Sequence, residues 1–142
     1  MSENPFDLNR FVRAQETTFA TALAEIESGR KMSHWMWFVF PQLRSLGRSP
    51  TAKRYGLSGL AEAKAYLAHL VLGPRLLECF EAAIAADAPS ATALFGTPDD
   101  LKFRSCATLF SVAGPTHDVF DRALARYFHG ERDPLALSTL AD

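Results

Sequence analysis

Long hydrophobic runs are missing from this 142-residue sequence. No window approaches the roughly 20 consecutive apolar residues that a membrane-spanning helix needs. The opening stretch MSENPFDLNRF contains acidic side chains and lacks the apolar core of a secretory signal. We therefore expect a protein with no membrane partner and a cytoplasmic location. The length predicts a single domain over residues 1–142.

Cysteine and metal-binding patterns are also scarce. Cys79 and Cys106 are the two cysteines, and neither has the Cys-x-x-Cys partner of a zinc or redox site. Cys106 could act as a thiolate nucleophile with His34 as its base, but its place inside a predicted helix favours a buried, inert thiol. The glycine patterns of phosphate loops, dinucleotide-binding folds and hydrolase nucleophile turns are absent. We therefore expect no metal and no cofactor.

Acidic residues are absent from one long segment. Residues 28–61 contain no Asp or Glu but six basic side chains, whereas residues 1–27 carry a net charge of −3 and residues 62–142 carry −4. The overall net charge of −1 argues against a generally basic, nucleic-acid-binding protein but is compatible with a local anion site. We refer to residues 28–61 as the acid-free segment.

The acid-free segment combines the chemistry that an anionic ligand with a ring would need. Lys31 and Arg48 can attract an anion, and Gln42 can both donate and accept hydrogen bonds. A helix that starts at Ser49-Pro50 would leave free backbone N–H groups beside Arg48, a usual place for a phosphate. Three aromatic side chains could stack on a flat ring: Trp35, Trp37 and Tyr55.

Each of these residues also has an ordinary structural interpretation. The aromatic run at residues 35–40 is more often core than site, although pocket walls are themselves mostly apolar. His34 could be a satisfied structural histidine or a general base near neutral pH. We predict a catalytic role for His34 and Lys31, with the other residues binding the ligand.

Apolar residues recur at helical spacing along most of the chain, which predicts an all-α fold. We expect a compact bundle of about seven or eight short helices, the first running from an Asp7 cap to Gly29. The aromatic stretch at residues 34–40 is predicted to be a short buried helix capped by Ser33. Capping side chains, prolines and glycines predict the other helix starts, at Ser49, Ser58, Gly73, Ser90, Thr97, Thr116 and Asp133.

Several strings match a known family. The most specific is HWMWFVFPQ at residues 34–42, and LGRS at 46–49, LGPRL at 72–76 and SCATLF at 105–110 add to it. At these positions the sequence resembles the domain of unknown function 1810 family, whose members are often labelled calpastatin-like. The resemblance covers nearly the whole chain. It implies a compact, mainly helical single domain and no established activity.

The resemblance adds three residues to the candidate site, namely Arg75, Lys102 and Ser105, which are polar members of the matching strings. Arg75 lies in the first turn of a predicted helix, where a cation opposes the helix dipole. It therefore needs a partner, either a carboxylate such as Glu78 or a bound anion. Lys102 follows Asp99 closely, which offers it a structural ion pair instead.

Three hypotheses for function remain open. The leading one is a domain that binds a small anionic ligand with a ring, such as a nucleotide or an ADP-ribose-like molecule. An extension of this hypothesis is that the domain carries out hydrolase or transferase chemistry on that ligand. The alternative is a non-catalytic protein-interaction or regulatory module, which an exposed apolar patch near residues 35–40 would favour. Nucleic-acid binding through the acid-free segment is the weakest of the three.

Overall fold

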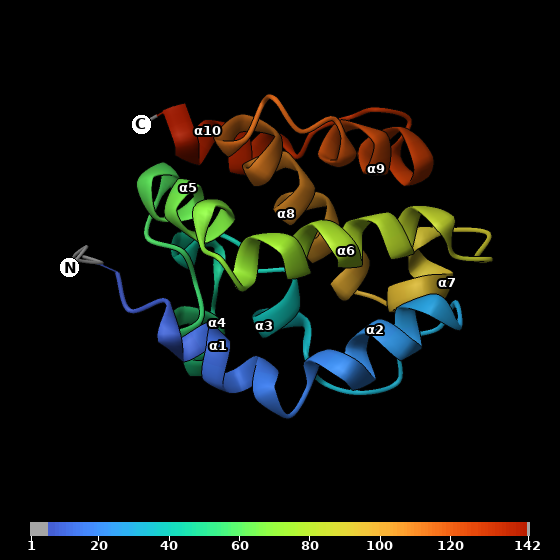
Figure 1. The fold of residues 1–142 in the computed structure, drawn as a ribbon. Coiled ribbons are helices and arrows are strands. Elements are labelled where there is room, and N and C mark those ends of the chain that lie inside the picture. The colour runs from blue at the N-terminus through green and yellow to red at the C-terminus, as the bar shows by residue number, and fades with distance from the viewer. Residues whose placement is uncertain (1–5, 142) are drawn as a thin grey trace.

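The computed structural model describes residues 6–141 and is all-helical over that range, which confirms the predicted fold class (Figure 1). It contains ten α-helices rather than seven or eight, together with a short 3-10 helix, η1, at Arg44–Leu46. The α-helices are α1 (Asn9–Glu16), α2 (Phe19–Glu27), α3 (Met36–Val39), α4 (Pro50–Arg54), α5 (Leu60–Ala68), α6 (Leu72–Ala85), α7 (Ala91–Phe95), α8 (Asp99–Ala113), α9 (Val119–Phe128) and α10 (Pro134–Ala141).

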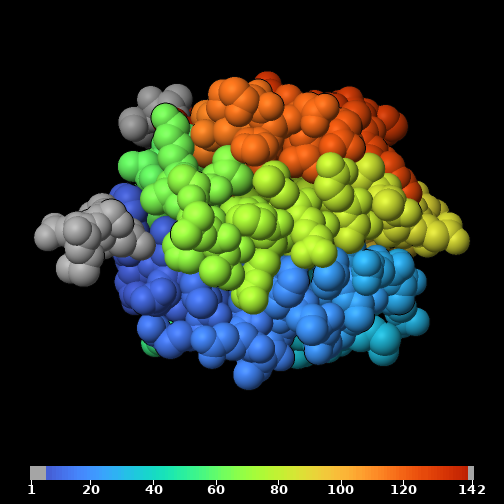
Figure 2. Space-filling view, viewed as in Figure 1, coloured from blue at the N-terminus to red at the C-terminus, as the bar shows by residue number. Residues whose placement is uncertain are grey.

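The two longest helices, α6 and α8, organise the bundle. Helix α6 packs against α2, α5 and α9, and α8 packs against α5, α7, α9 and α10. One face of the molecule shows α6 as a yellow-green band between the blue α1–α2 segment and the orange C-terminal segment (Figure 2). Among the described residues, no helix combines the length and apolarity required to cross a bilayer.

Aromatic rings fill the centre of the core. Phe80 of α6 stacks on Phe103 of α8 with ring centroids 5.0 Å apart. Phe40, from the predicted aromatic run, meets both rings edge-on at 5.1 and 5.0 Å. Such edge-to-face pairs add to the free energy gained by burying the rings. The C-terminal end of the aromatic run therefore holds the acid-free segment against α6 and α8.

The first predicted helix is wrong in its extent, because it is divided at Thr17 and Thr18 into α1 and α2. Neither glycine nor proline marks this break. Thr18 donates its hydroxyl to the Ala14 carbonyl at 2.7 Å, a local bond that competes with regular helix and commonly bends it. Asp7 does not cap α1, whose N-cap is Leu8 without a side-chain hydrogen bond. Gly29, with φ of +85°, follows the end of α2 as expected.

Three predicted caps are confirmed. The hydroxyls of Ser49 and Ser90 accept hydrogen bonds from the backbone N–H groups three residues later, each at 3.0 Å. The Asp133 carboxylate accepts from the Leu135 N–H at 3.1 Å at the start of α10. The short helix within residues 34–40 is confirmed as α3, but Ser33 does not cap it. The Ser33 hydroxyl donates instead to Glu25 at 2.6 Å.

A buried ion pair connects α1 to α5. Arg10 lies 3.0 Å from Glu62, with side chains that are 9% and 2% exposed. The same guanidinium donates to the carbonyls of Arg54 and Gly56 at 2.8 and 3.0 Å. Glu62 in turn accepts from the Ser58 N–H at 2.7 Å. These bonds fix the segment between α4 and α5. Every polar atom of the Arg10 and Glu62 side chains has a partner.

We expect Arg10→Met to lower the free energy of unfolding by about 3–5 kcal/mol, because removing one member of a buried pair leaves the other charge uncompensated. Urea unfolding followed by circular dichroism measures this. The matched control is Arg13→Met on the same helix, where the side chain is 61% exposed and 3.8 Å from Asp7. The control should change stability by less than about 0.5 kcal/mol. Equal losses in the two variants would contradict the structural role assigned to Arg10.

Candidate functional site

Residues 42–57 form a closed loop that becomes one wall of the site. The Arg44 N–H donates to the Leu57 carbonyl at 2.7 Å, and the Leu57 N–H donates to the Gln42 carbonyl at 2.9 Å. A side chain at Gly56 would place its Cβ only 2.4 Å from the Arg44 Cα, so the two ends of the loop approach as closely as glycine allows. Helix α4 and η1 lie within this loop, and Arg48 lies between them.

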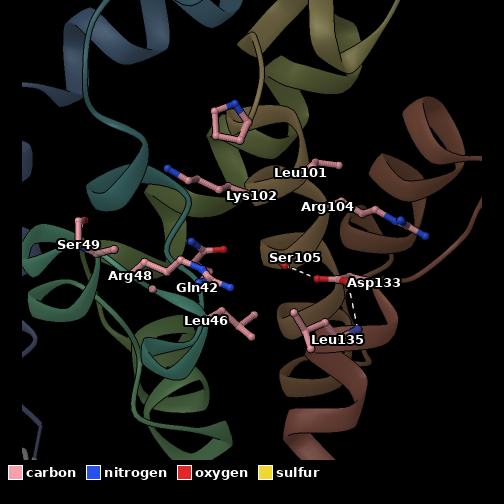
Figure 3. Close-up of a pocket in the computed structure, with 13 residues that line it drawn as sticks. Gln42, Leu46, Arg48, Ser49, Leu101, Lys102, Arg104, Ser105, Asp133 and Leu135 are labelled. Atoms are coloured by element: carbon pink, nitrogen blue, oxygen red, sulfur yellow. Dashed lines mark hydrogen bonds between the residues drawn. The ribbon is translucent and has the colours of Figure 1, made fainter.

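A cleft of about 570 Å³ separates this loop from α8 and the start of α10 (Figure 3). Its volume lies in the range typical of small-ligand pockets, roughly 300–1,000 Å³. One wall is supplied by the loop and the other by α8 with residues 133–135. The lining residues are Gln42, Leu46, Gly47, Arg48, Ser49, Ala52, Pro98, Leu101, Lys102, Arg104, Ser105, Asp133 and Leu135.

The three cations of the lining differ in how far they are already engaged. Arg104 donates to the carbonyls of Glu131 and Arg132 at 3.1 and 2.9 Å. Lys102 lies 3.4 Å from Asp99. Among the described residues, Arg48 has neither a carboxylate nor a hydrogen-bond partner, and it is exposed. Figure 3 shows its guanidinium directed into the cleft beside the Gln42 amide. Arg48 is thus the cation most available to a ligand.

A serine and an aspartate lie together on the opposite wall. The Ser105 hydroxyl donates a short hydrogen bond to one carboxylate oxygen of Asp133, drawn as a dashed line in Figure 3. The other carboxylate oxygen caps α10 through the Leu135 N–H. The Asp133 N–H donates to the Thr108 hydroxyl at 2.9 Å. Asp133 was predicted as a helix start and missed as a site residue, because nothing near it in the sequence indicates that Ser105 is its neighbour.

Five of the eleven predicted site residues line this cleft, and they come from two segments far apart in the chain: Gln42, Arg48, Ser49, Lys102 and Ser105. The predicted phosphate position at the start of α4 is less open than expected. The Ala52 N–H already donates to the Ser49 hydroxyl, and the Lys53 N–H donates to the Ser49 carbonyl at 3.0 Å. Neither N–H group is free for a phosphate.

The predicted stacking residues lie outside the cleft. Trp35 is 1% exposed and belongs to the core. Trp37 and Tyr55 line a separate hollow of about 10 Å³, which is room for one water molecule at most. The Lys102 ammonium lies 5.5 Å from the centre of the Trp37 ring, between that hollow and the cleft. A ring bound in the cleft would therefore contact aliphatic side chains rather than these aromatic ones.

The two predicted catalytic residues and Arg75 are also placed elsewhere. His34 is exposed and is not part of the cleft lining. Lys31 lies 3.0 Å from Asp99, with its side chain only 7% exposed. It is connected to the cleft through Asp99, which pairs with Lys102 as well. Arg75 donates to the side-chain oxygen of Gln15 at 3.3 Å, on the α1–α2 side of the bundle, and among the described residues it has no ion pair with Glu78.

Comparison with known proteins agrees with the resemblance seen in the sequence. The family model for a protein of unknown function, DUF1810, matches residues 5–140. The chain belongs to the DUF1810 family. It is similar to the crystal structure of the conserved hypothetical protein Rv1873 from Mycobacterium tuberculosis, with 49% sequence identity and a TM-score of 0.96 over 98% of this chain and 99% of that one. No curated protein matches the chain.

The DUF1810 chain holds residues 32–35 around one carboxylate of α2. Glu25 accepts hydrogen bonds from the Met32 and Ser33 N–H groups at 2.7 and 2.9 Å. The Ser33 hydroxyl and the Trp35 indole N–H donate to it at 2.6 and 2.8 Å. Burial raises the pKa of Glu25, but the hydrogen bonds from Ser33, Met32 and Trp35 outweigh it and lower the pKa from 4.5 to about 2.

The thiols of this DUF1810 chain have no access to solvent. Cys79 and Cys106 are both free and buried. Burial raises the pKa of Cys79 to about 12 and that of Cys106 well above its ordinary range. Because Cys106 is buried while His34 is exposed, the two do not form a nucleophile and base. No group of three or more metal-ligating side chains occurs within residues 6–141.

Glu25→Gln should lower the free energy of unfolding by about 2 kcal/mol at neutral pH, since hydrogen bonds to a charged group contribute about 1.5–3 kcal/mol. The folded pKa lies below the unfolded value. The carboxylate therefore contributes fully above pH 4.5, and this contribution is lost as the pH falls toward about 2. Urea unfolding at several pH values should show the wild type and E25Q converging in acid. Glu27→Gln, an exposed neighbour, should differ little from wild type throughout, and a pH-independent E25Q difference would contradict the assignment.

A thiol titration tests the burial of the cysteines. Native protein should release almost no chromophore with a water-soluble disulfide reagent at pH 8, because thiolates with raised pKa values and no solvent access do not react. In denaturant, both of the chain's two cysteines should react. Rapid reaction of one thiol in the native protein would show that α6 or α8 is more open than the structure indicates.

Proposed function

We propose that the cleft between residues 42–52 on one side and α8 and the start of α10 on the other binds a small organic anion with a ring, of the nucleotide or ADP-ribose-like class. The observation that carries this proposal is Arg48, an exposed guanidinium without a carboxylate partner among the described residues, directed into a cleft of about 570 Å³ (Figure 3). A guanidinium presents several donors in one plane, which suits phosphate and carboxylate groups.

The charge balance of the cleft supports an anionic ligand. Its lining contains three cations, Arg48, Lys102 and Arg104, and one carboxylate, Asp133. Of these cations, Arg104 lies 3.7 Å from Glu131, which is outside the lining. Behind the lining, Lys31 and Lys102 share the single carboxylate of Asp99 at 3.0 and 3.4 Å. One positive charge is therefore in excess at that ion cluster. A concave site with an excess of one sign of charge raises the local concentration of the opposite ion.

The apolar part of the lining supports a ligand with a hydrophobic body. Leu46, Leu101 and Leu135 line the cleft, and Leu101 and Leu135 are 57% and 61% exposed. Burying such side chains against a ring contributes about 25 cal/mol for each Å² of apolar surface removed from water. We assign no reaction to the cleft, because His34 and Lys31 are not among its lining residues.

The interaction-module and nucleic-acid hypotheses are each related to particular side chains of the acid-free segment. The exposed apolar patch expected for an interaction module at residues 35–40 is not formed, because Trp35, Met36, Val39 and Phe40 are buried. The weaker nucleic-acid hypothesis has one observation in its favour. Among the described residues, five of the six basic side chains of the acid-free segment make no ion pair: Arg30, Arg44, Arg48, Lys53 and Arg54.

Isothermal titration with AMP, NAD and ADP-ribose tests the proposal. We expect binding of at least one of them, and Arg48→Ala should weaken it roughly tenfold or more, since a hydrogen-bonded charge contact is worth about 1.5–3 kcal/mol. The matched control is Arg30→Ala, an exposed arginine of the same segment that is outside the cleft lining. The control should bind within about twofold of wild type.

Two outcomes would overturn the proposal. One is the absence of binding for all three ligands at millimolar concentration. The other is an equal loss of affinity in the Arg48 and Arg30 variants, which would indicate a general charge effect of the acid-free segment. The nucleic-acid hypothesis would be favoured if an unrelated oligonucleotide bound with a steep salt dependence and if the Arg48 and Arg30 variants lost affinity for it equally.

A further inference from the structure

Cationic donors and hydrogen-bond acceptors lie close together in the cleft, with Arg48 on the loop wall and Lys102 on α8. Arg48 and Lys102 can only donate hydrogen bonds, since neither side chain has an acceptor atom. Three residues after Lys102 on α8, the Ser105 hydroxyl has committed its proton to Asp133. Ser105 and Asp133 therefore present only lone pairs to a ligand. A ligand that contacts both sets of groups has to carry an acceptor-rich group for the cations and a donor for Ser105 and Asp133.

The acceptor side has unused capacity. A carboxylate has about four lone-pair directions, and Asp133 uses one for Ser105 and one for the Leu135 N–H. The Ser105 oxygen accepts no hydrogen bond from any described residue. Asp133 is half-buried and faces the cleft beside Ser105 (Figure 3). The remaining lone pairs are thus available where a ligand would lie.

The donor that fits this position is a neutral one. An ammonium group would also donate to Asp133, but the lining carries three cations against this single carboxylate. A positive charge on the ligand would be repelled by this excess of positive charge in the lining. Hydroxyl groups donate without adding charge, and a carboxylate paired with ribose hydroxyls is an established way to recognise a nucleoside.

From this arrangement we infer that Ser105 and Asp133 recognise vicinal hydroxyls of the ligand, while Arg48 and Lys102 take its anionic group. The cleft thereby selects hydroxylated phosphates, such as nucleotides with an intact ribose, over equally charged molecules that lack the hydroxyls. Gln42 lies beside Arg48 on the loop wall (Figure 3), and its amide can both donate and accept a hydrogen bond. This inference rests on the proposed function and adds a specificity that anion binding alone does not require.

The test compares two ligands with the same base and the same phosphate, AMP and 2′,3′-dideoxy-AMP. By isothermal titration, the wild-type protein should bind AMP about tenfold or more tightly than the dideoxy compound, because hydroxyl donors to a carboxylate are lost. Asp133→Asn should reduce this ratio to about twofold or less, since asparagine still caps α10 but replaces one acceptor oxygen with a donor. Ser105→Ala should reduce the ratio in the same direction.

The control is Asp87→Asn, an exposed carboxylate outside the cleft lining, which should keep the wild-type ratio. If both nucleotides bind wild type equally and Arg48→Ala weakens both, the hydroxyl inference is overturned while the proposed function stands. If neither nucleotide binds, nor NAD or ADP-ribose, the proposed function fails and this inference fails with it. The wild-type comparison decides between these outcomes even if a variant does not fold.

Discussion

Carboxylates from outside the acid-free segment hold its loops in place. Glu25 of α2 accepts hydrogen bonds from the N–H groups of Met32 and Ser33 and from the side chains of Ser33 and Trp35. Glu62 of α5 pairs with Arg10, whose guanidinium also donates to the carbonyls at the end of α4. Asp99 of α8 neutralises Lys31. A stretch without its own acids is therefore tied to three separate helices through their carboxylates.

These three contacts leave positive charge at the surface. Each of the three carboxylates is already committed within the fold, and the exposed arginines between residues 44 and 54 make no ion pair among the described residues. Arg44 and Arg54 line a smaller hollow with Asp7 and Glu62, whereas Arg48 lines the larger cleft, whose opposite wall carries the acceptors Ser105 and Asp133. Charge selection by Arg48 and hydrogen-bond selection by Ser105 and Asp133 would then act on opposite ends of one ligand.

The fold class and several local features could be predicted from the sequence, and the contacts between distant segments could not. The caps at Ser49 and Ser90 are decided by neighbouring backbone groups, so their residue types were sufficient. The break between α1 and α2 has no glycine or proline to mark it. The Thr18 hydroxyl donates to the Ala14 carbonyl there, but threonine is not a residue type that predicts a break by itself. Gln42, Arg48 and Ser49 were selected for their chemistry, and Lys102 and Ser105 through the family resemblance, but only the fold places Asp133 beside Ser105. Trp35 was expected at a ligand and instead packs in the core.

The distance along the chain between the two walls of the cleft has a consequence during protein synthesis. Residues 42–52 emerge from the ribosome well before residues 133–135, and folding generally begins with the part already made. Until α8 has been made and α10 has docked on it, the wall opposite Leu46 and Ala52 is incomplete. A ligand that needs both walls cannot assist the early steps, so the nascent chain has to rely on its own helix packing, and recognition becomes available only to the finished fold.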